Sequence, residues 1–189
     1  MNVRIEKVFP IPASTDKTWL LLQDIPGVAS CLPGASVIEC VDASHYKGQV
    51  AVKVGPASML FRGEVEVKTI DPASHVMRLV GKGTDSTGSS GASLDLTARI
   101  EAVDATSCNL VGSSDVSISG KAAAFGGRMM NTVADQVLNQ FAANFAAKVQ
   151  ALNAPITELP PAPTQLNALA LAWAILKDWL RSLFSPKKA

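Results

Sequence analysis

The sequence has few of the residues that usually build metal and redox centres. Its 189 residues include two histidines, His45 and His75, and three cysteines, Cys31, Cys40 and Cys108. The cysteines are too widely spaced for a C-x-x-C or other metal-ligand pattern, and the histidines are too isolated to complete one. We therefore expect all five to be structural, with no bound metal and with reduced thiols, as in the cytoplasm.

An excess of charge of one sign is also missing. The chain carries 17 Lys and Arg against 16 Asp and Glu, a net charge of +1, which argues against a nucleic-acid-binding protein. Residues 1–149 hold 13 basic and 14 acidic residues and carry −1, whereas residues 150–189 hold 4 and 2 and carry +2. The positive excess therefore belongs to the C-terminal region.

Long apolar runs are absent as well. Residues 1–9 alternate charged and apolar side chains and contain no hydrophobic segment typical of a signal peptide. In the C-terminal region the longest uncharged apolar run, residues 168–176, has nine residues, whereas a transmembrane helix needs about 20. We expect neither a signal peptide nor a membrane-spanning helix.

Catalytic patterns are not evident either. The sequence shows no Ser-His-Asp or Cys-His arrangement, and no pair of acids falls on an apolar strand face. It also has no redox-cofactor motif. We predict no catalytic residues and no covalent or metal cofactor, so any electron transfer would depend on a bound ligand.

What the sequence does contain is a succession of strand patterns. A first strand near residues 3–9 is expected to break at Pro10, and helices are expected at 14–23 and 24–30. In residues 45–54, Tyr46, Gly48, Val50, Val52 and Val54 share one face. Similar alternation predicts strands at 58–70, 77–82, 94–101 and 106–118. Such alternation is typical of an antiparallel sheet with one covered face.

The cover of that sheet is predicted at residues 121–149. Apolar residues recur there every fourth position, at Phe125, Met129, Val133, Val137, Phe141 and Phe145. Gly126 and Gly127 interrupt the pattern, so either the helix begins after Gly127 or a backbone or ligand approaches closely there. The elements together predict an α+β domain over residues 1–150, with residues 81–93 as a hairpin loop.

A long helix across a bent sheet leaves a concave space, which is either filled by side chains or occupied by a ligand. Gly48 and Gly63 lie on the covered face, where they either make room or permit a bend. Methionines on that face suit a flexible apolar ligand, although ordinary core packing explains each one equally well. The predicted lining is Met59, Phe61, Met77, Leu79, Leu94, Leu96, Leu110, Phe125, Met129 and Val133. Arg128 would meet a ligand or, more simply, form a surface ion pair.

The last segments of the chain differ in character from the domain. Residues 151–164 are rich in proline and predict a semi-extended linker. Residues 165–189 predict an amphipathic helix whose apolar side chains fall mostly on one arc of roughly 140°. Such a helix docks on a membrane surface or on a protein, its own domain included. The predicted membrane-binding residues are Leu169, Trp173, Leu176, Lys177, Trp179, Leu180, Arg181, Leu183, Phe184, Lys187 and Lys188.

Several short segments, in order, carry a resemblance to a known family. They are Pro33-Gly34, residues 46–56, Phe61-Arg62-Gly63, Gly120-Lys121, residues 125–128 and Gln140-Phe141. Together they resemble the CoxG-like family of carbon monoxide dehydrogenase subunits, over residues 1–149. The resemblance implies a helix-grip fold of the START and polyketide-cyclase-like (SRPBCC) superfamily.

The same resemblance implies a function. Family members are associated with molybdenum-dependent CO dehydrogenases at the cytoplasmic membrane. The implied role is to bind a respiratory quinone (menaquinone or ubiquinone) or a similar lipid, and thereby to recruit such an enzyme to the inner face of the cell membrane, to pass electrons to the quinone pool, or both. An assembly or maturation factor is the alternative, and a small-molecule cyclase or hydrolase would need a buried acid or base.

Overall fold

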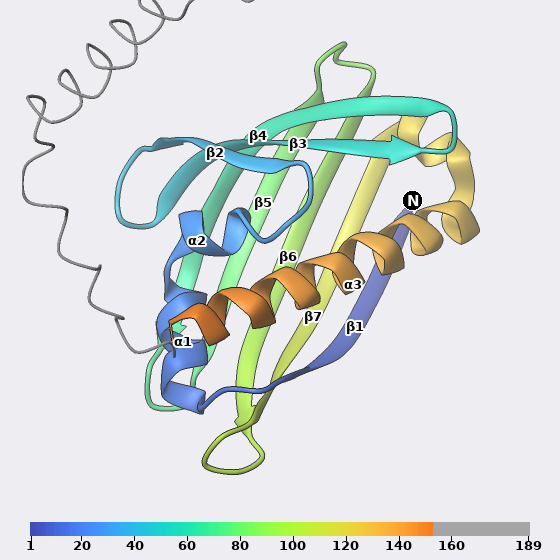
Figure 1. The fold of residues 1–189 in the computed structure, drawn as a ribbon. Coiled ribbons are helices and arrows are strands. Elements are labelled where there is room, and N and C mark those ends of the chain that lie inside the picture. Colours follow the sequence, from blue (N-terminus) through green and yellow to red (C-terminus); the bar gives the residue numbers. More distant parts are fainter. Residues whose placement is uncertain (153–189) are drawn as a thin grey trace, which may run out of the picture. The chain divides into compact units, whose positions relative to one another are not determined.

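The computed structural model describes residues 1–152. The predicted tail, 165–189, and the predicted linker from residue 153 onward lie outside the described residues. The elements, shown in Figure 1, are β1 (Asn2–Ile11), α1 (Thr15–Gln23), α2 (Ile25–Ala29), β2 (Ala35–Cys40), β3 (His45–Val54), β4 (Ala57–Asp71), β5 (Val76–Asp85), β6 (Ser90–Ala102), β7 (Cys108–Gly120), the 3-10 turn η1 (Lys121–Phe125) and α3 (Gly126–Ala151).

Seven antiparallel strands form one sheet in the order β1-β7-β6-β5-β4-β3-β2. From β2 to β7, strands that follow one another in the chain are neighbours in the sheet. The first strand, β1, pairs with the last, β7. Figure 1 shows α3 crossing one face of the bent sheet, with α1 and α2 beside its C-terminal end. The predicted α+β class, with a long helix covering an antiparallel sheet, is confirmed.

The first strand continues past the point where a break was expected. β1 extends to Ile11, and Pro10 lies opposite Asn109 of β7. Proline has no amide hydrogen to donate, so it is tolerated in a strand that has a neighbour on one side only. β1 is such an edge strand, which is why the predicted break at Pro10 is wrong.

The other edge strand, β2, was not predicted. Its pairing with β3 shifts register between Val37 and Glu39. An irregularity of this kind disturbs the two-residue alternation by which a strand is recognised in a sequence.

The face that α3 turns to the sheet agrees with the predicted one at Phe141 and Phe145 but departs from it at the N-terminal end of the helix. Phe145 and Val149 have no exposed surface, whereas Met129 is 41% exposed. At 3.6 residues per turn, a four-residue step drifts by about 40°, so Met129 lies about 160° around the helix from Phe145. Met130, eleven residues before Phe141, lies within about 20° of it. The prediction that Met129 faces the sheet is therefore wrong.

The start of α3 explains one of its two glycines. The helix begins at Gly126, which has a φ of +77°, a conformation that favours glycine. No heavy atom lies within 4 Å of the position that a Cβ would take at Gly126 or Gly127. Backbone conformation at Gly126, rather than a close approach, thus accounts for the interruption.

The hydrophobic core lies towards one end of the domain. It joins α1, α2, the ends of β5, β6 and β7, and the C-terminal half of α3, with Trp19, Leu22, Met77 and Phe145 among its buried side chains. No residue of the first half of α3 belongs to this cluster. That half is rich in short and polar side chains, so the domain is filled at one end only.

This asymmetry predicts unequal costs for two substitutions in the same helix. Phe145→Ala removes a fully buried ring and should lower the free energy of unfolding by about 3–5 kcal/mol. Met129→Ala, on the exposed face, should change it by less than about 0.5 kcal/mol. Urea unfolding of both variants measures the difference, and comparable losses would contradict the described packing.

Candidate functional site

A cavity of about 460 Å³ lies between α2 and strands β2 to β7. Two rows of residues that pair across the strands form its floor. One row is Gly48, Gly63, Gly83, Ala92 and Ile118, and the other is Tyr46, Val65, Gly81, Leu94 and Val116. Its volume falls within the range of about 300–1,000 Å³ that small-molecule sites occupy.

Glycines in this floor have two effects at once. A Cβ at Gly63 would collide with the Lys82 carbonyl oxygen, and one at Gly83 would lie 2.9 Å from the Arg62 carbonyl oxygen. The neighbouring backbones therefore approach too closely for a side chain. Since both glycines also line the cavity, their missing side chains leave room in the cavity as well as permitting the close approach of the strands. Whether that room holds a ligand stays a prediction.

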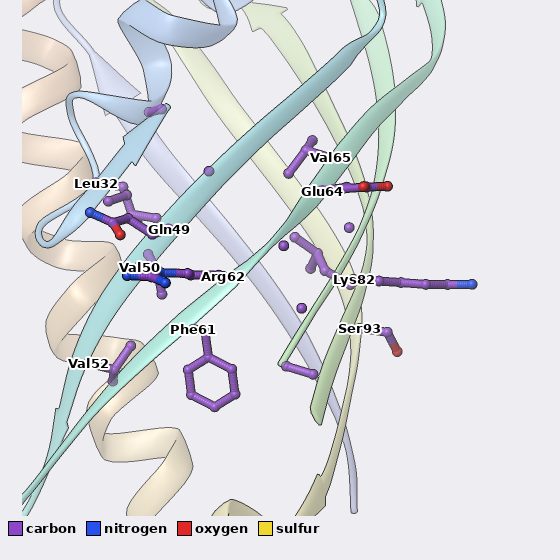
Figure 2. Close-up of a pocket in the computed structure, with 18 of the residues that line it drawn as sticks. Leu32, Gln49, Val50, Val52, Phe61, Arg62, Glu64, Val65, Lys82 and Ser93 are labelled. Carbon is purple, nitrogen blue, oxygen red and sulfur yellow. The ribbon is translucent and has the colours of Figure 1, made fainter. Parts of the chain in front are cut away.

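The charged residues beside the cavity have exposed side chains. Arg62, Glu64 and Lys82 alternate along β4 and β5 with the apolar residues that face inward. Figure 2 shows Glu64 and Lys82 pointing away from Phe61 and Val65. The interior surface is therefore apolar, which suits an apolar occupant.

The roof of the cavity comes from two separate stretches of the chain. Ile25 and Ala29 of α2 and Leu32 of the following loop cover one side, and Ala122 of η1 and Met130 of α3 cover the other. Met130 is the contribution of α3, and its flexible thioether adapts to irregular shapes. The sequence placed both Met129 and Met130 on the covered face, and only Met130 lines the cavity.

The ten predicted lining residues divide into three groups. Met59, Phe61 and Leu94 line the large cavity. Met77, Leu79, Leu96 and Leu110 line a second cavity of about 120 Å³. Phe125, Met129 and Val133 line neither of the two. Phe125 belongs to η1 rather than to α3, and Met129 lies on the exposed side of α3. Whether any of these residues binds a ligand stays a prediction.

Several other residues that line the large cavity were not predicted as site residues, although the sequence pattern had placed some of them on the covered face. The alternation in residues 45–54 had placed Val50, Val52 and Val54 on the covered face, and all three line the large cavity. Ile25 and Leu32 gave no such signal, because their position depends on how α2 packs.

One buried carboxylate also escaped the sequence analysis. β5 extends to Asp85 and β6 begins at Ser90, so the loop predicted at 81–93 is shorter than expected. Asp85 lies on the inner face of β5 and is 8% exposed. The Thr87 hydroxyl and the Ser90 amide, 2.7 Å away, donate to this carboxylate and hold its pKa below its usual range. The Ser90 hydroxyl in turn accepts from the Ala122 amide at 3.0 Å. Asp85 therefore acts as an ionised acceptor that fixes the β5–β6 turn to η1.

The remaining candidate groups lie away from the cavities. Cys31 and Cys108 are buried free thiols whose pKa values are raised by burial, and Cys40 is exposed. Within residues 1–152, no carboxylate forms the ion pair expected for Arg128.

The described part of the chain offers neither a cluster of metal ligands nor a membrane-spanning helix. Over residues 1–152, no three His, Cys, Asp or Glu side chains converge as a metal site. None of the helices in that range has the length and apolar character needed to cross a membrane.

Comparison with known proteins gives one family and a shared fold. A family model that describes the CoxG subunit of carbon monoxide dehydrogenase matches residues 8–150. A conserved protein from Geobacillus kaustophilus shares 18% identity, with a TM-score of 0.71 over 79% of this chain and 96% of that one. No curated protein matches the sequence.

Two further solved structures place the fold in a wider group. An aromatase/cyclase, Zhui, from Streptomyces sp. R1128 has 17% identity and a TM-score of 0.58, covering 79% of this chain and 94% of its own. A START superfamily protein from Mycobacterium smegmatis has 16% identity and a TM-score of 0.55, covering 79% and 98%. The predicted START-like helix-grip fold is confirmed.

The contrast between two floor glycines can be tested directly. Gly63→Ala places a methyl group against the backbone of β5 and should lower the free energy of unfolding by about 1–3 kcal/mol. Gly81→Ala meets its nearest atom, the Glu64 carbonyl oxygen, at 3.5 Å, so it should be neutral or stabilising by up to about 1 kcal/mol. Thermal unfolding of both variants measures this difference in stability, and equal destabilisation would rule out the described strand spacing.

Proposed function

The chain belongs to the CoxG family of carbon monoxide dehydrogenase subunits, and from this premise we propose that it is a ligand-binding accessory protein of a CO-dehydrogenase-type molybdenum hydroxylase. The proposed ligand is a respiratory quinone, menaquinone or ubiquinone, or a lipid of similar character. The protein would recruit the enzyme to the membrane and connect it with the quinone pool.

The apolar cavity is the observation that carries this proposal. It offers about 460 Å³, and its inward side chains are almost all hydrocarbon. Val50, Val52, Met59 and Phe61 face it and are only half-buried, so an apolar occupant would remove their surface from water. Burial of apolar area contributes about 25 cal/mol per Å², which favours a ligand dominated by hydrocarbon, with its few polar atoms at one end.

The chemistry of the cavity supports carriage of the ligand rather than its conversion. An enzyme that acts on a bound molecule needs an acid or base within hydrogen-bond reach of it. Asp85, the buried carboxylate, is already occupied by Thr87 and Ser90 and does not line either cavity. We therefore propose a non-enzymatic role, in which the quinone itself accepts electrons from the partner enzyme and protons from water and leaves as the quinol.

The sequence of the tail supports a position at the inner face of the cell membrane. Residues 165–189 combine Trp173 and Trp179 with a basic end, and each basic residue near an anionic leaflet contributes about 1 kcal/mol. The last 12 residues of the predicted linker, 153–164, would reach roughly 37 Å at polyproline pitch. The cavity would thus stay close to the bilayer in which its ligand dissolves.

Ligand extraction tests the cavity. Mass spectrometry of organic extracts of the purified protein should find a quinone or lipid in the native chain. Ala92→Leu, which fills the floor, should reduce that yield about tenfold, because the inserted side chain occupies the ligand volume. Ala51→Leu is the matched control, since Ala51 is exposed on the outer face of β3. A native chain that is consistently empty would refute carriage and favour an assembly role.

Liposome flotation tests the tail. The full-length protein should float with vesicles that contain anionic lipid, and a truncated protein that ends at Asn153 should remain at the bottom of the gradient, because it lacks the basic amphipathic segment. Flotation of the full-length protein should also weaken as salt is raised. Equal binding by both proteins would show that the tail does not anchor the chain.

A further inference from the structure

The second cavity lies directly beside the first. It encloses about 120 Å³ between strands β1, β5, β6 and β7 and the three α-helices. Leu22 of α1, Met77 of β5 and Phe141 of α3 are among the residues that line it. The function proposed above uses only the large cavity and leaves this space without a role.

The two cavities share one continuous floor. On β5, Gly81 lines the large cavity and Leu79 the small one; on β6, Leu94 and Leu96 divide in the same way. The two members of each pair are two positions apart in a strand, so they point to the same face at a spacing of about 6.6 Å. The cavities therefore lie end to end along the concave face of the sheet.

Ile25 separates the two spaces. Of the described residues, it alone lines both cavities, and it is 9% exposed. As a β-branched residue it has a stiff χ1, which makes it a defined barrier rather than an adaptable one.

The backbone that carries Ile25 is fixed from both sides. The Asp24 carboxylate accepts from the Gly27 amide at 3.0 Å. From α3, the Lys148 ammonium donates to the Gly27 carbonyl oxygen at 3.1 Å and to the Ser30 hydroxyl at 2.8 Å. Passage between the cavities thus depends on the Ile25 side chain rather than on movement of α2.

We propose that the small cavity is the far end of the ligand site, where it receives the end of a long apolar chain, and that Ile25 limits the chain length admitted. This inference rests on the proposed function, since it requires a ligand in the large cavity. The polar side chains in the small lining are Lys7 and Ser114, and the Lys7 ammonium is paired with Asp135 at 2.7 Å. Such a space accommodates isoprenoid or acyl carbon and not a polar ring.

Gly112 offers a way to close the small cavity alone. It lines that cavity and not the large one, and a Cβ there would meet its nearest atom, Leu96 Cδ1, at 3.9 Å. Gly112→Val therefore projects into the small cavity without a backbone collision. Ser113→Val is the matched control, because the next residue of a strand points to the opposite face.

The experiment measures the affinity of the full-length protein for quinones that share one ring and differ in isoprenoid length, at a constant detergent concentration. In the native chain the affinity should rise with chain length. Gly112→Val should weaken the longest probe about tenfold and leave the shortest unchanged, and Ser113→Val should match the native chain. Ile25→Ala should act in the opposite direction and strengthen the longest probe selectively.

The outcomes separate this inference from the proposed function. If the short probe binds and Gly112→Val leaves the chain-length dependence unchanged, or weakens all probes equally, the small cavity is not part of the ligand site and only this inference fails. If no probe of any length binds the native chain, the proposed ligand and this inference fail together.

Discussion

The close approach of neighbouring strand backbones at Gly48, Gly63 and Gly83 is the constraint on which the cavity depends. These positions pair across β3, β4 and β5, and side chains there would meet backbone oxygen atoms of the adjacent strands. The absence of side chains at these glycines lets the sheet bend and leaves its inner surface open. If larger residues occupied these positions, their side chains would fill the space between the sheet and the helix, and the domain would have an ordinary core.

The two halves of α3 pack against different parts of the domain. Phe145 and Val149 pack the C-terminal half of the helix into the core, whereas the N-terminal half contributes Met130 to the cavity. Cooperative units with few buried apolar contacts open at lower free energy. The half of the domain that would admit a ligand is thus the half whose local opening costs least, and it can yield without loss of the packed end.

The sequence predicted those features that depend on local periodicity. Two-residue alternation identified the covered face of β3 and β4, and through it the lining residues Met59 and Phe61. A fixed four-residue step misplaced Met129, because the drift of a real helix accumulates over a long span. Ile25, which lies between the two cavities, had no sequence signal, since only the packing of α2 on α3 brings it over the sheet. The edge position of Pro10 likewise depends on a partner strand, β7, that is remote in the chain, and the register shift in β2 depends on how β2 pairs with β3.

The two edges of the sheet have a consequence for the protein's behaviour at high concentration. An open sheet offers unpaired amide and carbonyl groups on its outer strands, and these groups can recruit strands from other molecules. Here β1 carries Pro10, which has no amide hydrogen to offer, and β2 is distorted between Val37 and Glu39. Both features obstruct the addition of a further strand. The domain therefore combines a hollow inner surface with sheet edges that limit edge-to-edge aggregation.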